Sequence, residues 1–331
     1  MSGFPTAFPA ALTAALAARL EGRGREALRA RARTLSETYR ARRSTPAAGL
    51  TEADALAYAL TRMPATYAAL IAVLGRLHVE QPDLAPTRLL DAGCGLGAAT
   101  FAAQVVWPAL ATATLVDRNR FFLDFAAALA VECGLPSPEC VEADLTRLPP
   151  DPGVPADLVV LAYALTELAE IELLAAVEAL WARTGDTLVI VEPGAPRDYE
   201  RLMRARTWLV SAGGRVVAPC PHERPCPLTT PDWCHFPVRL PRSREHRLLK
   251  DADVPYEDEK FAFLVVRRAG EPAPGRLIAP PRAGKAGVAA KICAANGIIE
   301  TFTARRDKAD YHAMRKKDWG DALDAPAEEK P

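Results

Sequence analysis

The spacing of apolar residues along the chain changes from a helical to a strand-like pattern. Over residues 5–80, apolar side chains such as Leu12, Leu16 and Leu20 recur at helical spacing, which predicts helices. From residue 87 onward, short apolar runs alternate with helical segments. We expect strands over residues 88–91, 114–117, 140–144, 157–161 and 187–191, and helices from about residue 98 and over residues 119–133, 170–183 and 199–210. Near-continuous apolar strands that alternate with helices indicate an α/β fold with a parallel sheet covered on both faces.

The pattern changes again after residue 213. Residues 214–247 are rich in proline and cysteine and lack apolar periodicity, so we expect turns to dominate there. A last core strand is predicted over residues 261–266. Short strand-like runs at residues 277–278, 287–292 and 297–303 then indicate a small β module, followed by a basic helix over residues 305–317.

These changes predict four regions. They are a helical N-terminal extension, an α/β core, a Cys-rich loop with the last core strand, and a C-terminal β module with a basic tail, over residues 1–80, 81–213, 214–270 and 271–331. Within the extension, Ser44-Thr45-Pro46 is expected to break the helical run, and Thr51 is expected to begin a new helix.

Composition and charge narrow the class of protein. The 331 residues are 50% hydrophobic and 25% charged, which excludes a largely disordered chain. No charge-free apolar run of about 18 residues occurs, so no membrane span is expected. The seven cysteines come without a secretory signal pattern, which points to free thiols or metal ligands. The net charge is zero, yet residues 201–250 and 276–317 each carry ten bases and three acids, and such basic segments attract phosphate backbones.

A glycine-rich loop follows the first predicted strand, in the string Asp91-Ala92-Gly93-Cys94-Gly95-Leu96-Gly97. Glycines let the backbone approach a ligand closely, and the next helix offers unpaired N–H groups. The string satisfies the G-x-G-x-x-G/A dinucleotide fingerprint, but an acid before alternating glycines is typical of S-adenosylmethionine loops. Asp117 and Asp144 end the next two strands, where acids can hydrogen-bond a ribose diol and an adenine amino group.

On these residues, the stretch 85–200 resembles the class I methyltransferases. The resemblance implies a Rossmann-like sheet that binds S-adenosylmethionine through Asp91, Gly93, Gly95, Gly97, Asp117 and Asp144. A catalytic group is not recognisable, because the segment after the fourth strand reads Leu161-Ala162-Tyr163-Ala164-Leu165 and lacks both the Asn/Asp-Pro-Pro-aromatic motif and a cysteine. Whether the protein is an enzyme therefore stays open.

Four cysteines follow the predicted sheet, at Cys220, Cys226, Cys234 and Cys293. Their irregular, proline-rich surroundings gain little burial, and a metal centre would add the missing folding free energy. Four thiolates suit either zinc or an iron–sulfur cluster. The absence of a C-x₂-C knuckle disfavours zinc, although His222 or His235 could replace a thiolate in a zinc site.

The chain as a whole resembles the mitochondrial small-ribosomal-subunit-associated, methyltransferase-like proteins and their bacterial relatives. The resemblance spans about residues 50–321 and is carried by the cysteine strings, Val191-Glu192-Pro193-Gly194, Arg242-Ser243, the string from Tyr256 to Phe261, and the segment from Tyr311 to Asp321. It implies a four-iron four-sulfur cluster on Cys220, Cys226, Cys234 and Cys293. It also implies a role in small-subunit assembly and translation through ribosomal RNA.

From this resemblance we expect an rRNA-binding protein, monomeric off the ribosome, located in the bacterial cytoplasm, or in mitochondria if the chain is eukaryotic. The expected RNA-binding residues are Arg242, Arg244, Arg247 and Lys250, near the Cys-rich loop, and Arg305, Arg306, Lys316 and Lys317 in the tail. Two alternatives remain: an active S-adenosylmethionine-dependent rRNA methyltransferase, and a zinc-stabilised scaffold that binds proteins.

Overall fold

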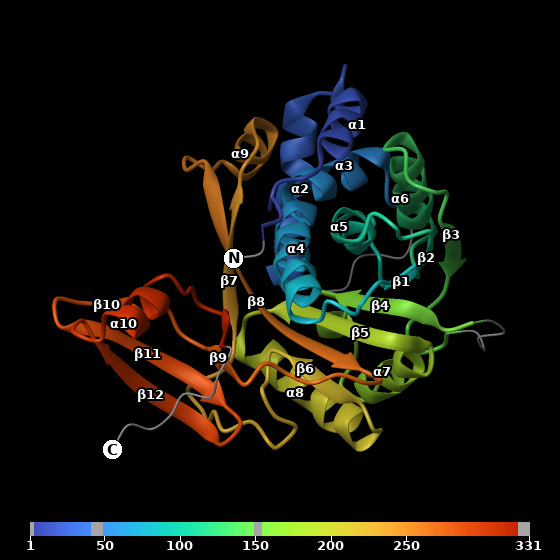
Figure 1. The fold of residues 1–331 in the computed structure, drawn as a ribbon. Coiled ribbons are helices and arrows are strands. Elements are labelled where there is room, and N and C mark those ends of the chain that lie inside the picture. The colour runs from blue at the N-terminus through green and yellow to red at the C-terminus, as the bar shows by residue number, and fades with distance from the viewer. Residues whose placement is uncertain (1–2, 41–48, 149–153, 324–331) are drawn as a thin grey trace.

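The computed structural model describes residues 3–40, 49–148 and 154–323, and its centre is one eight-stranded sheet (Figure 1). The strand order is β3-β2-β1-β4-β5-β8-β6, with β7 paired to β8. The strands are β1 (Arg88–Ala92), β2 (Thr112–Asp117), β3 (Glu139–Glu142), β4 (Ala156–Ala162), β5 (Thr184–Pro193), β6 (Arg215–Ala218), β7 (Phe236–Pro241) and β8 (Tyr256–Arg267).

Strand direction identifies the fold class. Strands β1 to β5 pair in parallel, whereas β8 runs antiparallel to β5 and to β6. A parallel sheet with one reversed strand inserted before the last is the arrangement of the class I methyltransferases. The predicted α/β, Rossmann-like fold is therefore confirmed.

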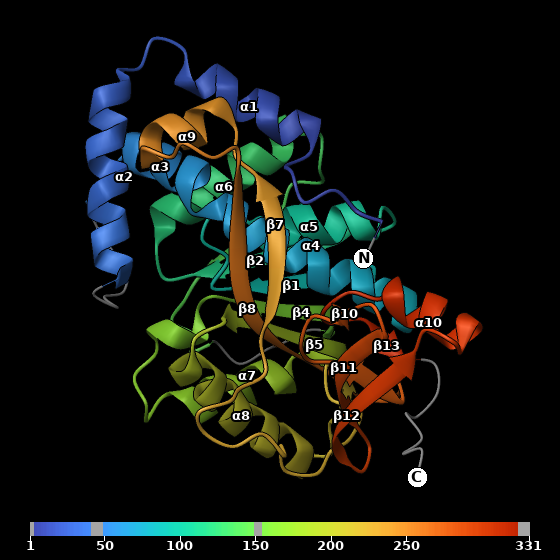
Figure 2. The ribbon, with the colours of Figure 1, turned by 90° about the vertical axis from the view of Figure 1, so that its left-hand side faces the viewer.

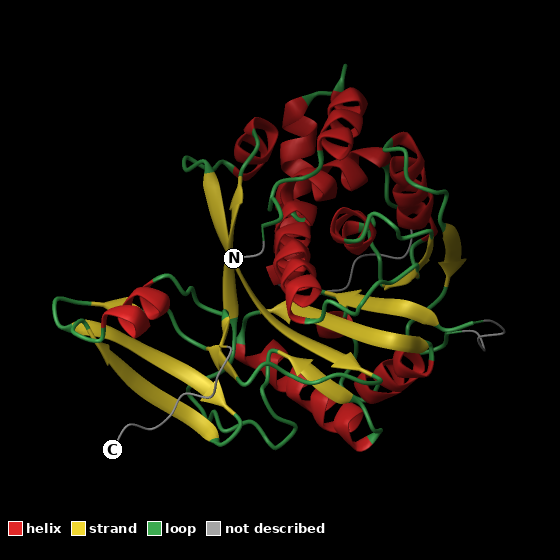
Figure 3. Cartoon of the chain, viewed as in Figure 1, coloured by secondary structure: helices red, strands yellow, loops and turns green. Residues whose placement is uncertain are grey.

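Helices cover both faces of the sheet, as Figures 1 and 3 show. The helices on one face are α4 (Met63–Glu80), α5 (Ala98–Val106) and α6 (Arg120–Glu132), and those on the other are α7 (Leu173–Ala182) and α8 (Pro196–Ser211). Each face of the sheet has its own apolar core, and alternate residues of a strand pack into one or the other. In β4, Leu158 and Val160 pack toward α4 and α5, while Val159 and Leu161 pack toward α7 and α8. Because both faces are buried, the strands are apolar throughout rather than alternating.

The predicted helical extension consists of α1 (Ala10–Leu20), α2 (Arg25–Arg40), α3 (Glu52–Thr61) and α4. The expected break at Ser44-Thr45-Pro46 lies outside the described residues. Thr51 begins α3 as expected, with its side chain and Asp54 forming a capping box. Leu12 and Leu16 belong to the same apolar core as α4 and α5, so the extension packs directly on the sheet unit.

A long hairpin arm adds regular structure that was not expected in residues 214–247. Strands β6 and β7 lie in this segment and helix α9 (Arg244–Lys250) begins in it, whereas residues 219–235 have no helix or strand, as expected. β7 alternates buried and exposed residues and pairs only with β8, which is twelve residues long. Prolines are tolerated on such an edge strand because their missing N–H can face away from the ladder. Figure 2 shows the arm rising from the sheet, with α9 beside α2 and α3.

The predicted C-terminal β module is present. It contains β9 (Gly275–Leu277), β10 (Arg282–Ala283), β11 (Gly287–Ala294), β12 (Gly297–Ala304), α10 (Lys308–Arg315) and β13 (Ala322–Leu323). Leu277, Ile292 and Ile299 form its small core. Arg276 is buried where the module meets the body and bonds Glu80 and the carbonyl of Pro219.

In the described part of the chain, no single helix has the length and apolar content to cross a bilayer. Only α3 and α4 taken together, with a 48° bend between them, reach those limits.

Candidate functional site

The glycine loop joins β1 to α5 in a conformation that requires glycine. Gly93, Gly95 and Gly97 have φ angles of 64°, 51° and 79°, in the left-handed region. A Cβ on Gly93 would lie 2.8 Å from the Cβ of Ala164, so the loop also passes close to the segment after β4. Gly97 is the residue from which α5 begins.

Asp91, near the end of β1, is hydrogen-bonded to the helix that follows the glycine loop. Its carboxylate is buried and accepts hydrogen bonds from the backbone N–H of Thr100 (3.0 Å) and from the Thr100 hydroxyl (2.9 Å). Burial raises the pKa of Asp91 to about 7. Asp91 and Gly97 do not line the cavity described below. They therefore affect the backbone conformation of the glycine loop and do not form part of the cavity surface.

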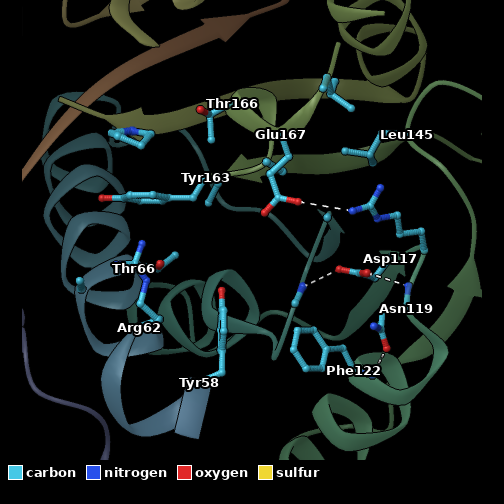
Figure 4. Close-up of a pocket in the computed structure, with 18 of the residues that line it drawn as sticks. Tyr58, Arg62, Thr66, Asp117, Asn119, Phe122, Leu145, Tyr163, Thr166 and Glu167 are labelled. Atoms are coloured by element: carbon cyan, nitrogen blue, oxygen red, sulfur yellow. Dashed lines mark hydrogen bonds and ion pairs between the residues drawn. The ribbon is translucent and has the colours of Figure 1, made fainter. Parts of the chain in front are cut away.

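The other four predicted cofactor residues, Gly93, Gly95, Asp117 and Asp144, line one cavity of about 450 Å³ (Figure 4). Asp117 accepts hydrogen bonds from the N–H groups of Gly95 and Asn119, both at 2.9 Å, and burial raises its pKa. Asp144 is exposed, and hydrogen bonds from the Thr146 backbone and hydroxyl lower its pKa. The cavity lies at the carboxyl ends of the parallel strands, where such sheets bind ligands.

The N-terminal helices supply a wall of this cavity that the sequence did not reveal. The residues that form this wall face the sheet edge in Figure 4. They are Tyr58 on α3, Arg62 between α3 and α4, and Thr66 on α4. The ring of Tyr58 lies 5.5 Å from that of Phe122, between ring centroids. No sequence signal marks these residues, because only the packing of the extension brings them to the pocket.

The segment after β4 is held in place by buried polar groups. Glu192 is fully buried and accepts the backbone N–H groups of Leu165 (2.9 Å) and Thr166 (3.0 Å). Burial raises the pKa of Glu192 to about 8. Two residues further, a Cβ on Gly194 would lie 2.8 Å from the backbone of Lys260, which explains the glycine in the string 191–194.

Carboxylates outnumber cations around the cavity. The lining acids are Asp117, Asp144, Glu167, Asp198, Glu257 and Glu259, and the lining cations are Arg62, Arg118 and Lys250. Arg118 and Glu167 form an ion pair at 3.7 Å that joins the segments after β2 and β4 (Figure 4). This balance favours a ligand that carries positive charge.

Tyr163 directly follows β4, at the position where methyltransferases of this fold can carry a catalytic motif. Its φ of 57° is rare outside glycine, and its hydroxyl donates to Glu259 at 2.8 Å. Burial raises its pKa well above the usual value, so the hydroxyl keeps its proton. Glu167, a second polar residue at this cavity, lies in the short 3₁₀ helix after β4 (Leu165–Glu167).

The four predicted metal ligands meet in a second cavity, of about 20 Å³, between the Cys-rich loop and β11. Cys220, Cys226 and Cys234 come from the loop, and Cys293 comes from β11. The Tyr199 hydroxyl donates to the Cys226 sulfur at 3.0 Å, and the Cys293 sulfur lies 3.8 Å from His222 Nε2. Among the described residues, no three His, Cys, Asp or Glu side chains are spaced to hold a single metal ion.

Two buried arginines flank these thiols. Arg206 is 3% exposed, donates to the carbonyl of His222, and has an Nε without a partner; its positive charge lowers the pKa of Cys220 against the larger effect of burial. It forms no ion pair with any described carboxylate, whereas Arg276 pairs with Glu80 at 2.6 Å. Burial and repulsion from the other three thiols raise the pKa of Cys234. The site therefore contains a buried positive charge that lacks an anionic partner.

The two predicted groups of RNA-binding residues lie apart. Arg242, Arg244, Arg247 and Lys250 belong to the arm around α9, which packs on α2 and α3, so the expectation that they lie near the Cys-rich loop is wrong (Figure 2). The reason is the long β7–β8 hairpin, which carries α9 away from the loop. Arg242 and Lys250 also pair with Glu257, at 3.2 and 2.9 Å, whereas Arg244 and Arg247 are exposed.

The tail group is more accessible. Arg305, Arg306 and Lys316 are exposed and form no ion pair with other described residues, while Lys317 donates to the carbonyl of Ala322. These residues lie at and beyond the end of β12, on the C-terminal module.

Comparisons with known proteins find relatives of this chain. The chain is 30% identical over 293 residues to the human mitochondrial ribosome assembly protein METTL17, which covers 82% of this chain and 63% of that protein. It is 29% identical over 197 residues to the fission yeast mitochondrial Rsm22-cox11 tandem protein 2, which covers 54% of this chain and 26% of that protein. The chain thus aligns with less than two thirds of the length of either relative. A solved structure of magnesium protoporphyrin IX methyltransferase from Synechocystis, with bound S-adenosylmethionine, aligns with 71% of this chain and 92% of that chain at 16% identity and a TM-score of 0.42.

A family model described as mitochondrial small ribosomal subunit Rsm22 matches residues 52–324, from the start of α3 to the end of the C-terminal module. This match covers well over half of the chain and includes both cavities. The chain therefore belongs to the Rsm22 family.

Proposed function

We propose that this protein binds ribosomal RNA of the small ribosomal subunit and assists its assembly and translation. Family membership supports this role, because the family model names the small subunit and the human relative is a ribosome assembly protein. The observation that carries the proposal is the convergence of four cysteines at the joint between the sheet unit and the basic C-terminal module. A centre at this joint would hold the module, with Arg305, Arg306 and Lys316, against the body.

The donor set fits a four-iron four-sulfur cluster better than a single ion. Tetrahedral zinc, with Zn–S bonds near 2.3 Å, needs sulfurs about 3.8 Å apart. No group of described side chains has single-ion spacing, and a cluster tolerates wider separation of its ligands. The unpaired Arg206 charge fits any centre held by four thiolates, because both a cluster and a zinc ion leave a net negative charge there. The zinc-stabilised scaffold is therefore less well supported on spacing alone.

Cys220, Cys226, Cys234 and Cys293 would hold the cluster, which when bound supplies a cross-link between loop and module. Residues 219–235, which carry three of these cysteines, have no helix or strand, so the loop is not held by the hydrogen bonds of regular secondary structure. Anaerobic purification followed by iron, sulfide and zinc analysis tests the assignment: about four irons per chain support it, and one zinc without iron contradicts it.

S-adenosylmethionine fits the larger cavity. The acidic lining suits a sulfonium cation. Asp117 ends β2 and Asp144 lies two residues beyond β3, where ribose and adenine partners would lie. Arg62 and Arg118 lie at the same cavity and could pair with the carboxylate of the ligand. Bound ligand would be enclosed by the N-terminal helices, which makes the cavity a cofactor site inside a binding protein.

The decisive experiment measures RNA binding at several salt concentrations. Cluster-loaded protein is titrated with small-subunit rRNA fragments, and affinity should fall steeply with salt, because phosphate contacts release counterions. Wild-type affinity that is insensitive to salt would contradict the proposal. We expect the protein to be monomeric off the ribosome. We also expect it wherever small subunits assemble, in mitochondria if the chain is eukaryotic and in the cytoplasm if it is bacterial.

Methyl transfer to rRNA is the second candidate function. The observation in its favour is that the cavity continues past Gly93 to Tyr163 and Glu259, which leaves a polar space beside a bound cofactor. Against it, the Tyr163 hydroxyl is already committed to Glu259. Incubating assembling subunits with labelled cofactor separates the two functions, since an enzyme transfers more than one methyl group per protein molecule.

A further inference from the structure

The outer face of the C-terminal module carries an exposed aromatic side chain. In the antiparallel register, Arg282 on β10, Ala289 on β11 and Phe302 on β12 form one row across three strands (Figure 1). Residues directly opposite on paired strands project from the same face. The alternate residues, such as Ala290 and Ile292, face the core of the module, so this row faces away from it.

Phe302 is 60% exposed, and its ring rests on a glycine. A Cβ on Gly287 would come within 2.7 Å of Cζ and 3.0 Å of Cε1 of the ring. The ring atoms Cζ and Cε1 therefore lie close to the β11 backbone at Gly287. The neighbouring Ala289 is small and itself exposed, so it does not bury the ring. The Phe302 side chain thus packs on the sheet while most of its surface stays open to solvent.

Four cations lie in segments that adjoin this row: one on β10, one in the β10–β11 turn and two directly after β12. Arg282, Lys285, Arg305 and Arg306 are exposed and form no ion pair with other described residues. The nearest acid on the same face of β12, Glu300, lies opposite Lys291, one row closer to the Cys-rich loop. A flat aromatic platform bordered by four free cations is complementary to a nucleobase attached to a phosphate backbone.

We propose that Phe302 is a stacking platform for an unpaired base of single-stranded RNA, whose flanking phosphates lie on Arg282, Lys285, Arg305 and Arg306. The inference rests on the proposed binding of rRNA and names the part of the RNA that this face contacts. A ring that only covered Gly287 would not need free cations around it. Duplex RNA is disfavoured, because its bases are already stacked and cannot reach a flat sheet face.

The test compares Phe302→Leu, Phe302→Trp and the wild type in the full cluster-loaded chain. Each is titrated with a labelled single-stranded oligouridine of twelve nucleotides and with an RNA duplex of equal charge. Stacking contributes about 1–3 kcal/mol per base, so Phe302→Leu should weaken single-strand binding by about 5- to 150-fold. Phe302→Trp should retain or improve it. Duplex affinity, the salt dependence and the thermal unfolding midpoint should stay close to wild type, because no phosphate contact or core contact is lost.

Three outcomes would overturn the inference. Equal single-strand affinity of Phe302→Leu and wild type would remove the stacking role while leaving rRNA binding intact. Equal weakening of single-strand and duplex binding would assign the effect to general damage. Unchanged RNA affinity with lost binding to small-subunit proteins would assign the ring to a protein contact. Failure of the wild type to bind any RNA would instead contradict the proposed function itself.

Discussion

The two cavities differ in how many of their buried polar groups have hydrogen-bond partners within the protein. Around the glycine loop, Asp91, Asp117 and Glu192 all accept hydrogen bonds from nearby backbone N–H groups. In the cysteine cavity, Arg206 Nε and His222 Nδ1 are buried without partners, and the thiols repel one another if ionised. The first cavity is thus preformed by the sheet, whereas the second leaves buried polar groups without partners, which the proposed metal centre would explain. The predictions below test this contrast.

The largest effect is expected from Cys293→Ala. This change removes the cysteine ligand that β11 would contribute, so the proposed cluster should be lost. Stability should fall with it, because metal binding contributes several kcal/mol to folding. We expect most bound iron to be lost and the C-terminal module to become sensitive to limited proteolysis. Cys133→Ala is the matched control, since Cys133 lies at the end of α6, outside both cavities. Full iron content in Cys293→Ala would show that Cys293 is not a ligand, and would contradict the proposed difference between the two cavities.

Arg206→Met should change stability in opposite directions with and without the metal centre. In the metal-free protein, it removes a buried charge that lacks an acidic partner and should raise the free energy of unfolding by about 1–3 kcal/mol. In the loaded protein, it removes the positive charge beside Cys220 and should speed the loss of iron. Arg204→Met, on the exposed side of the same helix, is the control. Denaturant unfolding of both forms measures the difference, and equal signs would refute the role given to Arg206.

Stability should depend on pH through the acids behind the first cavity. Burial raises the folded pKa of Asp91 from 3.8 to about 7, so the unfolded carboxyl ionises first as the pH rises. The stabilisation is complete below about pH 4 and is lost progressively up to about pH 7, amounting to a few kcal/mol. Asp91→Asn should flatten the difference between urea midpoints at pH 5 and pH 7.5. An Asp91→Asn profile parallel to the wild type would show that Asp91 does not titrate in this window.

Asp117→Asn should mainly weaken binding of S-adenosylmethionine. Both of its oxygens accept backbone N–H groups, so an amide nitrogen there would leave one N–H unpaired, at a cost of about 1–3 kcal/mol in stability. Calorimetric titration should show at least a tenfold loss of affinity, against a smaller loss for the exposed Asp144→Asn. Equal losses would mean that burial does not distinguish these two acids.

The smallest effect on stability is expected from the double variant Arg306→Gln and Lys316→Gln. Both residues are exposed and unpaired within the described chain, so the unfolding midpoint should not change. Each lost phosphate contact should lower the slope of log affinity against log salt by about 0.7 to 0.9. Arg242→Gln, at a residue paired with Glu257, should leave that slope unchanged but lower stability slightly. An unchanged slope in the double variant would remove the tail from the RNA surface.

The sequence predicts the sheet unit well because its signals are local. Continuous apolar runs arise when both faces of a strand are buried, and β1, β2, β4 and β5 all include their predicted ranges. The arm was missed for the opposite reason. β7 is an edge strand bordered by prolines, and it forms only because β8 extends beyond the sheet to pair with it. In the same way, Tyr58 and Arg62 carry no motif and reach the pocket only through helix packing.

By itself, the sequence determined the α/β class, the glycine loop with its positive φ angles, and the identity of the four cysteines, since each depends on residue type and short-range spacing. The tertiary structure decided which groups share a cavity. It brought Cys293 to the loop, carried α9 away from it, and left Arg206 buried without an acid. Such placements depend on burial and pairing between segments far apart in the chain, and no local pattern of residues records them.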